Sequence, residues 1–258
     1  IICTIKQNTY TSRNFFIDKI KDFIAKLFSK KVDHFIAVNK GVRNIYYNRF
    51  KVPKNKITIS TQLGVDTILF NDYHCAMDKE SLVVGYVGRL IEYKGVLDLV
   101  NAVEEIRLSG IELKLFLLGE GPLRETMLSK KYNWLTIFNP IPHHKVVDFL
   151  RNLDIFVMPS RNLKYHEEHD SHALMEAMAV GIPSIATKSG SNIEVLSNAG
   201  ILIEPEKIEE LVGAIKKMIN DLELRNKYSK KGRSRIIKEY SIENIALNYK
   251  NIYKKINA

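Results

Sequence analysis

The sequence predicts an α/β protein with one complete, doubly wound parallel-sheet domain of the Rossmann-like type and part of a second Rossmann-like domain. Three observations support this fold class. From about residue 81 onward, short apolar runs alternate with amphipathic stretches of helical length, which is typical of strands joined by crossover helices. Several runs are apolar throughout, as in strands that are covered on both faces. Residues 1–80 repeat the pattern with fewer strands. A segment of this length buries little surface when it folds alone, so we expect it to be part of a larger domain.

The expected elements of the complete domain follow from these runs in chain order. Strands are expected at residues 82–87, 113–118, 135–138, 155–158, 183–186 and 201–203. Helices are expected at about 92–109, 122–131, 144–152, 172–180, 191–197 and 206–220. Right-handed crossovers between parallel strands place such helices on both faces of the sheet. Two further amphipathic segments, 222–239 and 241–256, close the chain.

The first 80 residues are expected to hold the carboxyl-terminal part of the other domain. Strands are predicted at 1–5, 33–38 and 56–61, helices at 12–30 and 39–49, and a polar, irregular linker at 64–79. The chain opens on Ile1 rather than Met and runs directly into a strand, so we expect it to begin in mid-fold. The predicted domains are 1–80, 81–240 and a terminal helix, 241–258, that packs back toward the first domain.

Composition excludes several classes of protein. The 258 residues are 45% hydrophobic, which is ample for a buried core and excludes a disordered chain. Two cysteines exclude a disulfide scaffold and a CxxC motif. No apolar run approaches the ~20 residues of a membrane helix, and no secretory signal is visible, so a cytoplasmic protein is expected. The 39 Lys and Arg against 29 Asp and Glu give a net charge of +10, but these charges are spread over many helices, so nucleic acid is not an expected partner.

A glycine and two cations follow the first strand of the complete domain. Residues 88–95 read Gly-Arg-Leu-Ile-Glu-Tyr-Lys-Gly and lead into an expected helix. Gly88 allows close approach of a ligand to the backbone, and a helix amino terminus favours anions. Arg89 and Lys94 can both reach the carboxyl edge of the sheet, where open α/β sheets bind ligands. They suit a diphosphate, Arg89 as a planar fork and Lys94 as a point charge, with solvated surface charges as an equal alternative.

Two carboxylates form a second candidate site. Glu176 lies within the apolar run 173–180, which Gly181 and Pro183 end. Asp170 or Ser171 is the expected N-cap of this helix, which places Glu168 in the preceding loop. A loop carboxylate and a helix carboxylate can bracket one ligand and accept hydrogen bonds from sugar or ribose hydroxyl groups. Because burial of Glu176 among Ala, Leu and Met side chains is costly, it needs a partner.

These motifs occur in an order that resembles a known family. They are Gly88-Arg89 with Lys94-Gly95, then 119–122 (Gly-Glu-Gly-Pro), 154–160 (Asp-Ile-Phe-Val-Met-Pro-Ser), Glu168 with Glu176, and 176–183 (Glu-Ala-Met-Ala-Val-Gly-Ile-Pro). The chain resembles the retaining GT-B glycosyltransferases of family 4, which share a pair of glutamates with seven residues between them. The likeness covers most of residues 81–258, and the segment 56–70 resembles the junction between the two domains of that family.

The resemblance implies roles for these residues. Arg89, Lys94 and Glu168 would serve catalysis, the two cations by holding the diphosphate of the donor and Glu168 by touching the hydroxyl groups of the transferred sugar. Glu176 would bind the donor ribose. The complete set of implied donor-binding residues is Gly88, Arg89, Lys94, Pro142, His143, His144, Glu168, Asp170, Ser171, His172, Ala173 and Glu176. Pro142, His143 and His144 would cradle the nucleobase, and the backbone at 170–173 would contact the phosphates or the sugar.

The same resemblance implies the reaction and its partners. A hexosyl unit would move from a UDP-, GDP- or ADP-sugar to a glycan or lipid-linked acceptor with retention of configuration, and without a metal or other cofactor. Polysaccharide biosynthesis of the cell envelope is the expected setting. The stretch 169–172 (His-Asp-Ser-His) departs from the usual family pattern, which leaves the donor sugar open. The oligomeric state is not indicated by the sequence.

Three alternatives accompany this interpretation. The chain could be a nucleotide-sugar-binding subunit or a fragment that needs a partner for the rest of the acceptor domain. His166, His169 and His172 could hold a metal in a hydrolase, although such closely spaced ligands need distant residues to help. The basic, amphipathic helix at 12–30 is expected to pack on the sheet of the first domain, and alternatively could lie on the anionic inner face of a membrane.

Overall fold

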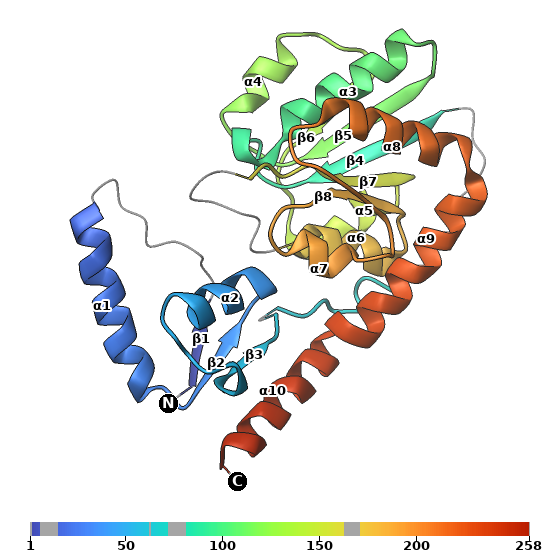
Figure 1. Ribbon diagram of the computed structural model, residues 1–258. Coiled ribbons are helices and arrows are strands. Elements are labelled where there is room, and N and C mark those ends of the chain that lie inside the picture. The colour runs from blue at the N-terminus through green and yellow to red at the C-terminus, as the bar shows by residue number, and fades with distance from the viewer. Residues whose placement is uncertain (1, 6–14, 62, 72–80, 163–170, 258) are drawn as a thin grey trace.

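Two parallel sheets form the framework of the protein. The computed structural model describes residues 2–5, 15–61, 63–71, 81–162 and 171–257 (Figure 1). A three-stranded sheet occupies the first part of the chain and a six-stranded sheet the second, and every strand pair is parallel. This arrangement confirms the predicted α/β class, with one full doubly wound sheet and one smaller sheet.

The smaller sheet has the order β1-β2-β3. Its strands are β1 (Ile2–Ile5), β2 (His34–Ala37) and β3 (Ile57–Ile59), with helices α1 (Phe15–Lys31) and α2 (Lys40–Asn48) and the single turn η1 (Lys54–Lys56) between them. Asn39 begins α2, because its side-chain oxygen accepts a 2.8 Å hydrogen bond from the amide of Val42. Phe35, Val42 and Ile57 belong to a small core of their own.

The larger sheet has the order β6-β5-β4-β7-β8-β9. Its strands are β4 (Leu82–Val87), β5 (Leu113–Leu118), β6 (Leu135–Phe138), β7 (Ile155–Met158), β8 (Ser184–Thr187) and β9 (Ile201–Ile203). The chain moves outward from β4 through β5 to β6, then returns to β7 on the other side of β4. In open α/β sheets, the crevice that binds ligands lies at the carboxyl edge where the strand order reverses, which is here beside the loops that follow β4 and β7.

Helices cover both faces of the larger sheet (Figure 1). They are η2 (Glu92–Lys94), α3 (Val96–Leu108), α4 (Leu123–Leu128), η3 (His143–Lys145), α5 (Val146–Leu150), α6 (His172–Val180), α7 (Asn192–Leu196), α8 (Ile208–Asn220) and α9 (Leu222–Arg235). The strands β7 and β8 are buried along their whole length, as a sheet covered on two faces requires. One large core joins these elements.

The end of the chain leads from the larger sheet to the smaller one. After α9, a π-helical stretch η4 (Ile236–Tyr240) precedes α10 (Ile242–Asn257), which runs beside the smaller sheet (Figure 1). The backbone of Val65 pairs with this junction, because its amide donates to Tyr240 O (2.8 Å) and its carbonyl accepts from the Ile242 amide (3.1 Å). Burial, assisted by Lys255 of α10, lowers the pKa of His34 on β2.

Several predicted boundaries differ from those in the structure. The helix expected from residue 92 begins at Val96, because Gly95 adopts a left-handed conformation (φ 68°) that separates the turn η2 from α3. The strand expected at 183–186 is shifted by one residue. The expected linker 64–79 is not polar throughout, since Val65 and Phe70 are fully buried in the large core. The domain limits at residues 80 and 240 remain predictions.

The helix α1 stands at the outer side of the smaller sheet (Figure 1). Ala25 packs on the small core, and Asp22 forms a 2.7 Å ion pair with Arg49. The larger apolar side chains of α1 are exposed; they are Ile20, Phe23, Ile24, Leu27 and Phe28, at 47–67%. The prediction that this helix packs its apolar face on the sheet is therefore wrong for these residues. Among the described helices, we find none with the length and apolar character needed to cross a membrane.

Candidate functional site

The loops that follow β4 and β5 interlock at the carboxyl edge of the larger sheet. The Leu90 amide donates to Glu120 O (2.8 Å), and the Leu123 amide donates to Leu90 O (3.1 Å). Gly119 is required at this contact, because a Cβ there would lie 1.9 Å from the carbonyl oxygen of Gly88. The interlock fixes the backbone on both sides of Arg89.

Arg89 is held at the start of the crevice. The Tyr86 hydroxyl donates a 2.9 Å hydrogen bond to the Arg89 carbonyl oxygen. The exposed guanidinium group lies 5.5 Å from the centroid of the Tyr93 ring and donates a hydrogen bond to the Tyr93 hydroxyl. Stacking and one hydrogen bond orient the guanidinium, and its other N–H groups remain able to meet an anion.

Lys94 is the last residue of the turn η2, and Gly95 anchors that turn to the neighbouring strand. A Cβ on Gly95 would lie 1.9 Å from the carbonyl oxygen of Pro159, just beyond β7. Arg161 strengthens the same junction: its amide donates to Tyr93 O (2.9 Å), and its guanidinium forms a two-point pair with the buried Asp98 (2.5 and 2.8 Å). These hydrogen bonds to Asp98 raise the pKa of Arg161. The loops after β4 and β7 are therefore tied together below the crevice.

Glu176 lies in the second turn of α6 with only 3% of its surface exposed. Its Oε1 atom is 2.5 Å from His143 Nε2 and 3.0 Å from His172 Nδ1. His172 is one helical turn earlier on α6, whereas His143 comes from η3, after β6. Two imidazole rings thus supply the partners that a buried carboxylate requires.

Ser171 is the N-cap of α6, which confirms one of the two predicted positions. Its side chain makes no capping hydrogen bond. The hydroxyl instead donates to Asn192 Oδ1 (2.6 Å) and lies 2.8 Å from Ser191 Oγ, in a buried hydroxyl network between the loops after β7 and β8.

The predicted site residues fall into three groups. Parallel strands bring the loops with Gly88, Arg89 and Lys94 and the loop 142–144 to the same edge of the sheet as the start of α6. Three residues of this set are in direct contact: Glu176 touches both His143 and His172. The side chains of Pro142 and His144 are exposed, and Ala173 is half-buried. Glu168 and Asp170, together with His166 and His169, lie outside the described residues.

Sequence reasoning missed two residues that contact this group. The Phe70 ring packs 5.6 Å, between centroids, from the His143 ring, and His172 Nε2 lies 3.4 Å from Gly64 O. Both belong to the segment expected to be a linker. The signal in the sequence was their place in the segment 56–70, which resembles a domain junction, because neither residue type indicates a site by itself.

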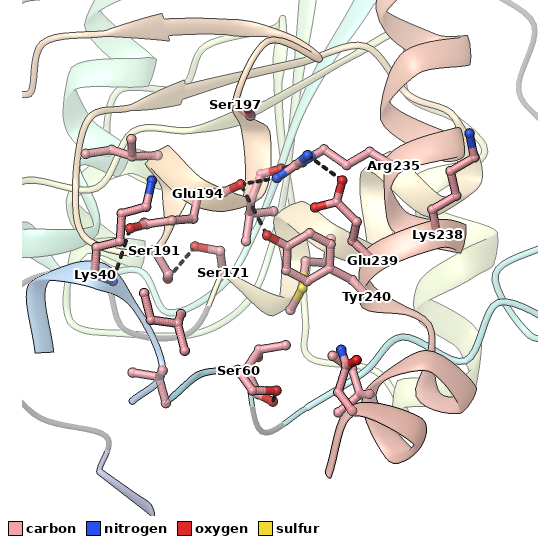
Figure 2. A pocket seen from close by; sticks show the side chains of 18 of the residues that line it. Lys40, Ser60, Ser171, Ser191, Glu194, Ser197, Arg235, Lys238, Glu239 and Tyr240 are labelled. Carbon is pink, nitrogen blue, oxygen red and sulfur yellow. Dashed lines mark hydrogen bonds and ion pairs between the residues drawn. The ribbon is translucent and has the colours of Figure 1, made fainter. Parts of the chain in front are cut away.

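A cavity of about 740 Å³ lies between the two sheets, on the side of Ser171 and Met175 (Figure 2). The smaller sheet contributes Ser60 and Thr61, and Lys40 begins the helix above them. The opposite wall comes from α7 and η4. Glu194 of α7 forms hydrogen bonds to both sides of the cavity. Its side-chain Oε1 atom accepts one from the Lys40 amide (3.2 Å), and its backbone carbonyl oxygen accepts one from the Arg235 guanidinium (2.7 Å).

Comparison with known proteins identifies the class of this fold. The solved glycosyltransferase of Rickettsia africae aligns over 99% of this chain and 70% of its own, with a TM-score of 0.80 at 20% identity. HepE of Anabaena, solved in complex with UDP, aligns over 98% of this chain and 72% of its own, with a TM-score of 0.80 at 15% identity. The architecture is that of the GT-B glycosyltransferases.

The family follows from the sequence match. The family model of glycosyl transferases group 1 matches residues 75–235, and the chain therefore belongs to that family. CapM of Staphylococcus aureus, a capsular polysaccharide biosynthesis glycosyltransferase, is 25% identical over 256 residues, which cover 90% of this chain and 66% of CapM. TuaC of Bacillus subtilis, described as a teichuronic acid biosynthesis glycosyltransferase, is 31% identical over 131 residues, which cover 50% of this chain and 31% of TuaC. The chain spans less than two thirds of the length of either relative.

Proposed function

We propose that this chain carries the donor site of a retaining glycosyltransferase of family 4, which moves a hexosyl unit from a nucleoside-diphosphate sugar to a glycan or lipid-linked acceptor. One observation carries the proposal: a buried carboxylate, Glu176, shares the carboxyl edge of the sheet with Arg89 and Lys94, where the strand order reverses. The membership in the group 1 family supports it, as do the roles of CapM in capsular polysaccharide biosynthesis and of TuaC in teichuronic acid biosynthesis.

The two cations bind the diphosphate. Arg89 offers N–H groups that can meet two phosphate oxygens at once, and Lys94 adds a point charge from the next turn. The amide groups at the start of α6 add further donors, since the first turn of a helix has N–H groups without helical partners. Charge that develops on the departing diphosphate is stabilised by groups already in place, which is the main source of rate enhancement in such a site.

Glu176 binds the ribose of the donor. A carboxylate accepts hydrogen bonds at both oxygens, and one oxygen of Glu176 is already engaged by His143 and His172. Both rings hold the carboxylate at a fixed orientation, while the loop 142–144 provides main chain for the nucleobase. The donor nucleotide is a uridine, guanosine or adenosine diphosphate.

The transfer itself needs no nucleophilic side chain. The acceptor oxygen forms a bond to the anomeric carbon as the bond from that carbon to the phosphate oxygen breaks, on the same face of the sugar. The proton of the acceptor hydroxyl passes to the leaving diphosphate. Glu168 contacts the hydroxyl groups of the sugar, and positioning lowers the barrier. No metal takes part, because Arg89 and Lys94 neutralise the diphosphate.

The cavity between the sheets suits the acceptor. Ser60, Thr61 and Ser197 line it, together with the basic residues Lys40, Arg235 and Lys238 and the acidic residues Glu194 and Glu239. Figure 2 shows these polar residues around the cavity, apart from Thr61. Such a lining offers hydrogen-bond donors and acceptors to a glycan. The cavity adjoins Ser171 at the start of α6, and Glu176 lies on the same helix.

A second candidate is a nucleotide-sugar-binding subunit that needs a partner for turnover. The observation in its favour is length, since the chain spans 66% of CapM and 31% of TuaC. Both candidates use the same donor residues, and turnover by the isolated chain separates them.

The test of the proposal is hydrolysis of the donor by the isolated chain. The chain is incubated with UDP-, GDP- and ADP-glucose in the presence of EDTA, and the released sugar is followed by proton NMR. We expect one donor to release glucose first as the α-anomer, the configuration of the donor, at a rate that EDTA does not lower.

The outcomes of this assay distinguish the candidates. Initial release of the β-anomer would overturn retention, and a requirement for added metal would overturn the role given to the two cations. Binding of a donor without any turnover would favour the subunit that needs a partner.

We also propose that α1 makes peripheral contact with an anionic membrane. Phe23 and Phe28 are 64% and 67% exposed, and Lys26 and Lys30 lie on the same helix. An apolar face bordered by basic residues binds the interface of anionic lipids. The chain should co-sediment with vesicles of phosphatidylglycerol and phosphatidylcholine more than with phosphatidylcholine alone.

Two variants sharpen this prediction. Phe23→Asp with Phe28→Asp should abolish co-sedimentation, whereas Ile68→Asp, at a 79% exposed apolar residue outside α1, should leave it intact. Equal sedimentation of the wild type with both kinds of vesicle would refute the electrostatic part of the proposal, and no sedimentation would refute it entirely.

A further inference from the structure

Three side chains at the donor site form a ligand set typical of a transition metal. His143 Nε2, His172 Nδ1 and a carboxylate oxygen of Glu176 all lie within 4.8 Å of one another. Two imidazoles with one carboxylate, and a fourth position left open, make up a well-known coordination set for zinc. The carboxylate is buried and the His143 side chain is 61% exposed, so an ion could enter from the crevice.

The orientation of His172 suits a metal ligand. Its Nδ1 atom faces Glu176 Oε1, 3.0 Å away, and its Nε2 atom lies 3.4 Å from the Gly64 carbonyl oxygen. Without a metal, Nδ1 can donate its proton to the Glu176 carboxylate. With a metal bound at Nδ1, the proton moves to Nε2 and faces the Gly64 carbonyl oxygen, which accepts it. A ligand histidine that gives its other N–H to a backbone carbonyl is also the usual arrangement around a metal.

The two distances from Glu176 need to change by less than an ångström, and all three ligand atoms lie within 4.8 Å of one another. Zinc bound at ~2.0–2.1 Å places tetrahedral ligand atoms roughly 3.3 Å apart. Glu176 Oε1 now lies 2.5 Å from His143 Nε2 and 3.0 Å from His172 Nδ1. His143 belongs to the exposed turn η3, so its ring can withdraw by the required fraction of an ångström.

We propose that His143, His172 and Glu176 bind one zinc ion and that this ion excludes the donor nucleotide. The exclusion rests on the proposed function, because it follows from the ribose-binding role of Glu176: a metal on Oε1 takes the carboxylate away from the ribose hydroxyl groups. The ion is therefore an inhibitor of the donor site rather than a cofactor of the transfer.

The metal site is tested first without nucleotide. Zinc affinity is measured by competition with a chromophoric chelator, and Co²⁺ is added separately to record its visible spectrum. We expect one ion per chain and the intense absorption of four-coordinate cobalt. His143→Ala should weaken zinc binding by at least ~100-fold, since loss of even a partner beyond the ligands costs ~10–100-fold.

Matched variants separate this site from other histidines. His144→Ala removes the neighbouring exposed ring, and the double variant His166→Ala with His169→Ala removes two histidines that precede α6 in the sequence. Both variants should retain the wild-type affinity for zinc. Because His143 is exposed, its alanine variant should fold, and circular dichroism checks this. Unchanged zinc affinity in His143→Ala, or an equal loss in His144→Ala, would overturn the proposal.

The exclusion is tested with UDP-, GDP- and ADP-glucose in a metal-buffered solution. At free zinc ten times its dissociation constant, the apparent affinity for the donor that binds should fall about tenfold, and His143→Ala should lose this sensitivity. Zinc binding that leaves donor affinity unchanged would overturn the exclusion. Zinc binding by a chain that binds none of the three donors would leave the metal site standing and refute the proposed function instead.

Discussion

At the scale of single residues, the environment of Glu176 separates what the sequence can predict from what it cannot. A glutamate within the apolar run 173–180 must find a partner when buried, and this follows from sequence alone. The identity of the partners does not follow from the sequence, because His143 lies 33 residues away from Glu176 in the chain. Nothing in the local sequence distinguishes His143, which contacts Glu176, from its neighbour His144. The path of β6 and η3 determines which of the two rings faces Glu176.

Gly95 provides a prediction at this scale. A Cβ at Gly95 would lie 1.9 Å from the Pro159 carbonyl oxygen, and the residue has a left-handed φ of 68°. Gly110 is a matched control, because its φ is 88° but no atom lies within 4 Å of an added Cβ. Gly110→Ala should cost about 1 kcal/mol of unfolding free energy from backbone strain alone. Gly95→Ala should cost at least ~2 kcal/mol more, since the backbone must also move.

Urea denaturation of the two variants measures both costs. Equal destabilisation by Gly95→Ala and Gly110→Ala would contradict the close contact between η2 and the end of β7. The contact matters for the site, because η2 ends on Lys94.

At the scale of elements, the strands and most helix beginnings were predictable, and the beginning of α3 was not. Apolar runs mark β4, β5, β6, β7 and β9 at their observed limits. Burial on both faces explains this for β7, which is buried along its whole length, whereas the edge strand β6 is exposed at alternate residues. The start of α3 was misplaced by four residues, since the left-handed conformation of Gly95 depends on a tertiary contact with Pro159. The exposed face of α1 was also missed, because amphipathic periodicity shows a face but not what covers it.

The contact between α10 and the smaller sheet carries a pH prediction. Burial of His34, with the nearby charge of Lys255, lowers its pKa from 6.5. The folded state then binds a proton less readily than the unfolded state, so this contribution to stability is complete above pH 6.5 and is lost as the pH falls below it. Thermal unfolding should therefore occur at a lower temperature at pH 5.5 than at pH 7.5.

A substitution isolates the contribution of His34 to this change in melting temperature with pH. The His34 ring lies 2.8 Å from Thr58 Oγ1, and His34→Gln keeps a polar group there without a titration. The variant should show a smaller fall in melting temperature between the two pH values, whereas His144→Gln, at an exposed ring, should behave as the wild type. An undiminished fall in His34→Gln would contradict the assignment.

At the scale of the whole molecule, two sheets are joined by two crossings of the chain. The segment with Val65 and Phe70 leads from the smaller sheet into the core of the larger one, and η4 with α10 leads back. The sequence predicted both sheets and a terminal helix directed to the first. It could not predict that the first crossing touches His172 and His143 of the proposed donor site through Gly64 and Phe70, because that contact depends on how the two sheets are placed relative to each other.

The central claim is that one nucleoside diphosphate binds where Arg89 and Glu176 share the edge of the larger sheet. Isothermal titration of the chain with UDP, GDP and ADP tests it most directly. Arg89→Ala and Glu176→Gln each remove a charged hydrogen-bonding group worth ~1.5–3 kcal/mol, so each should weaken binding about 10- to 100-fold. Arg151→Ala is the control, because Arg151 is 45% exposed and ends α5 just before β7, at the opposite edge of the sheet. We expect Arg89→Ala and Glu176→Gln to lose affinity for the nucleotide and Arg151→Ala to keep it. Unchanged affinity in both Arg89→Ala and Glu176→Gln, or no binding of UDP, GDP or ADP by the folded chain, would contradict the claim.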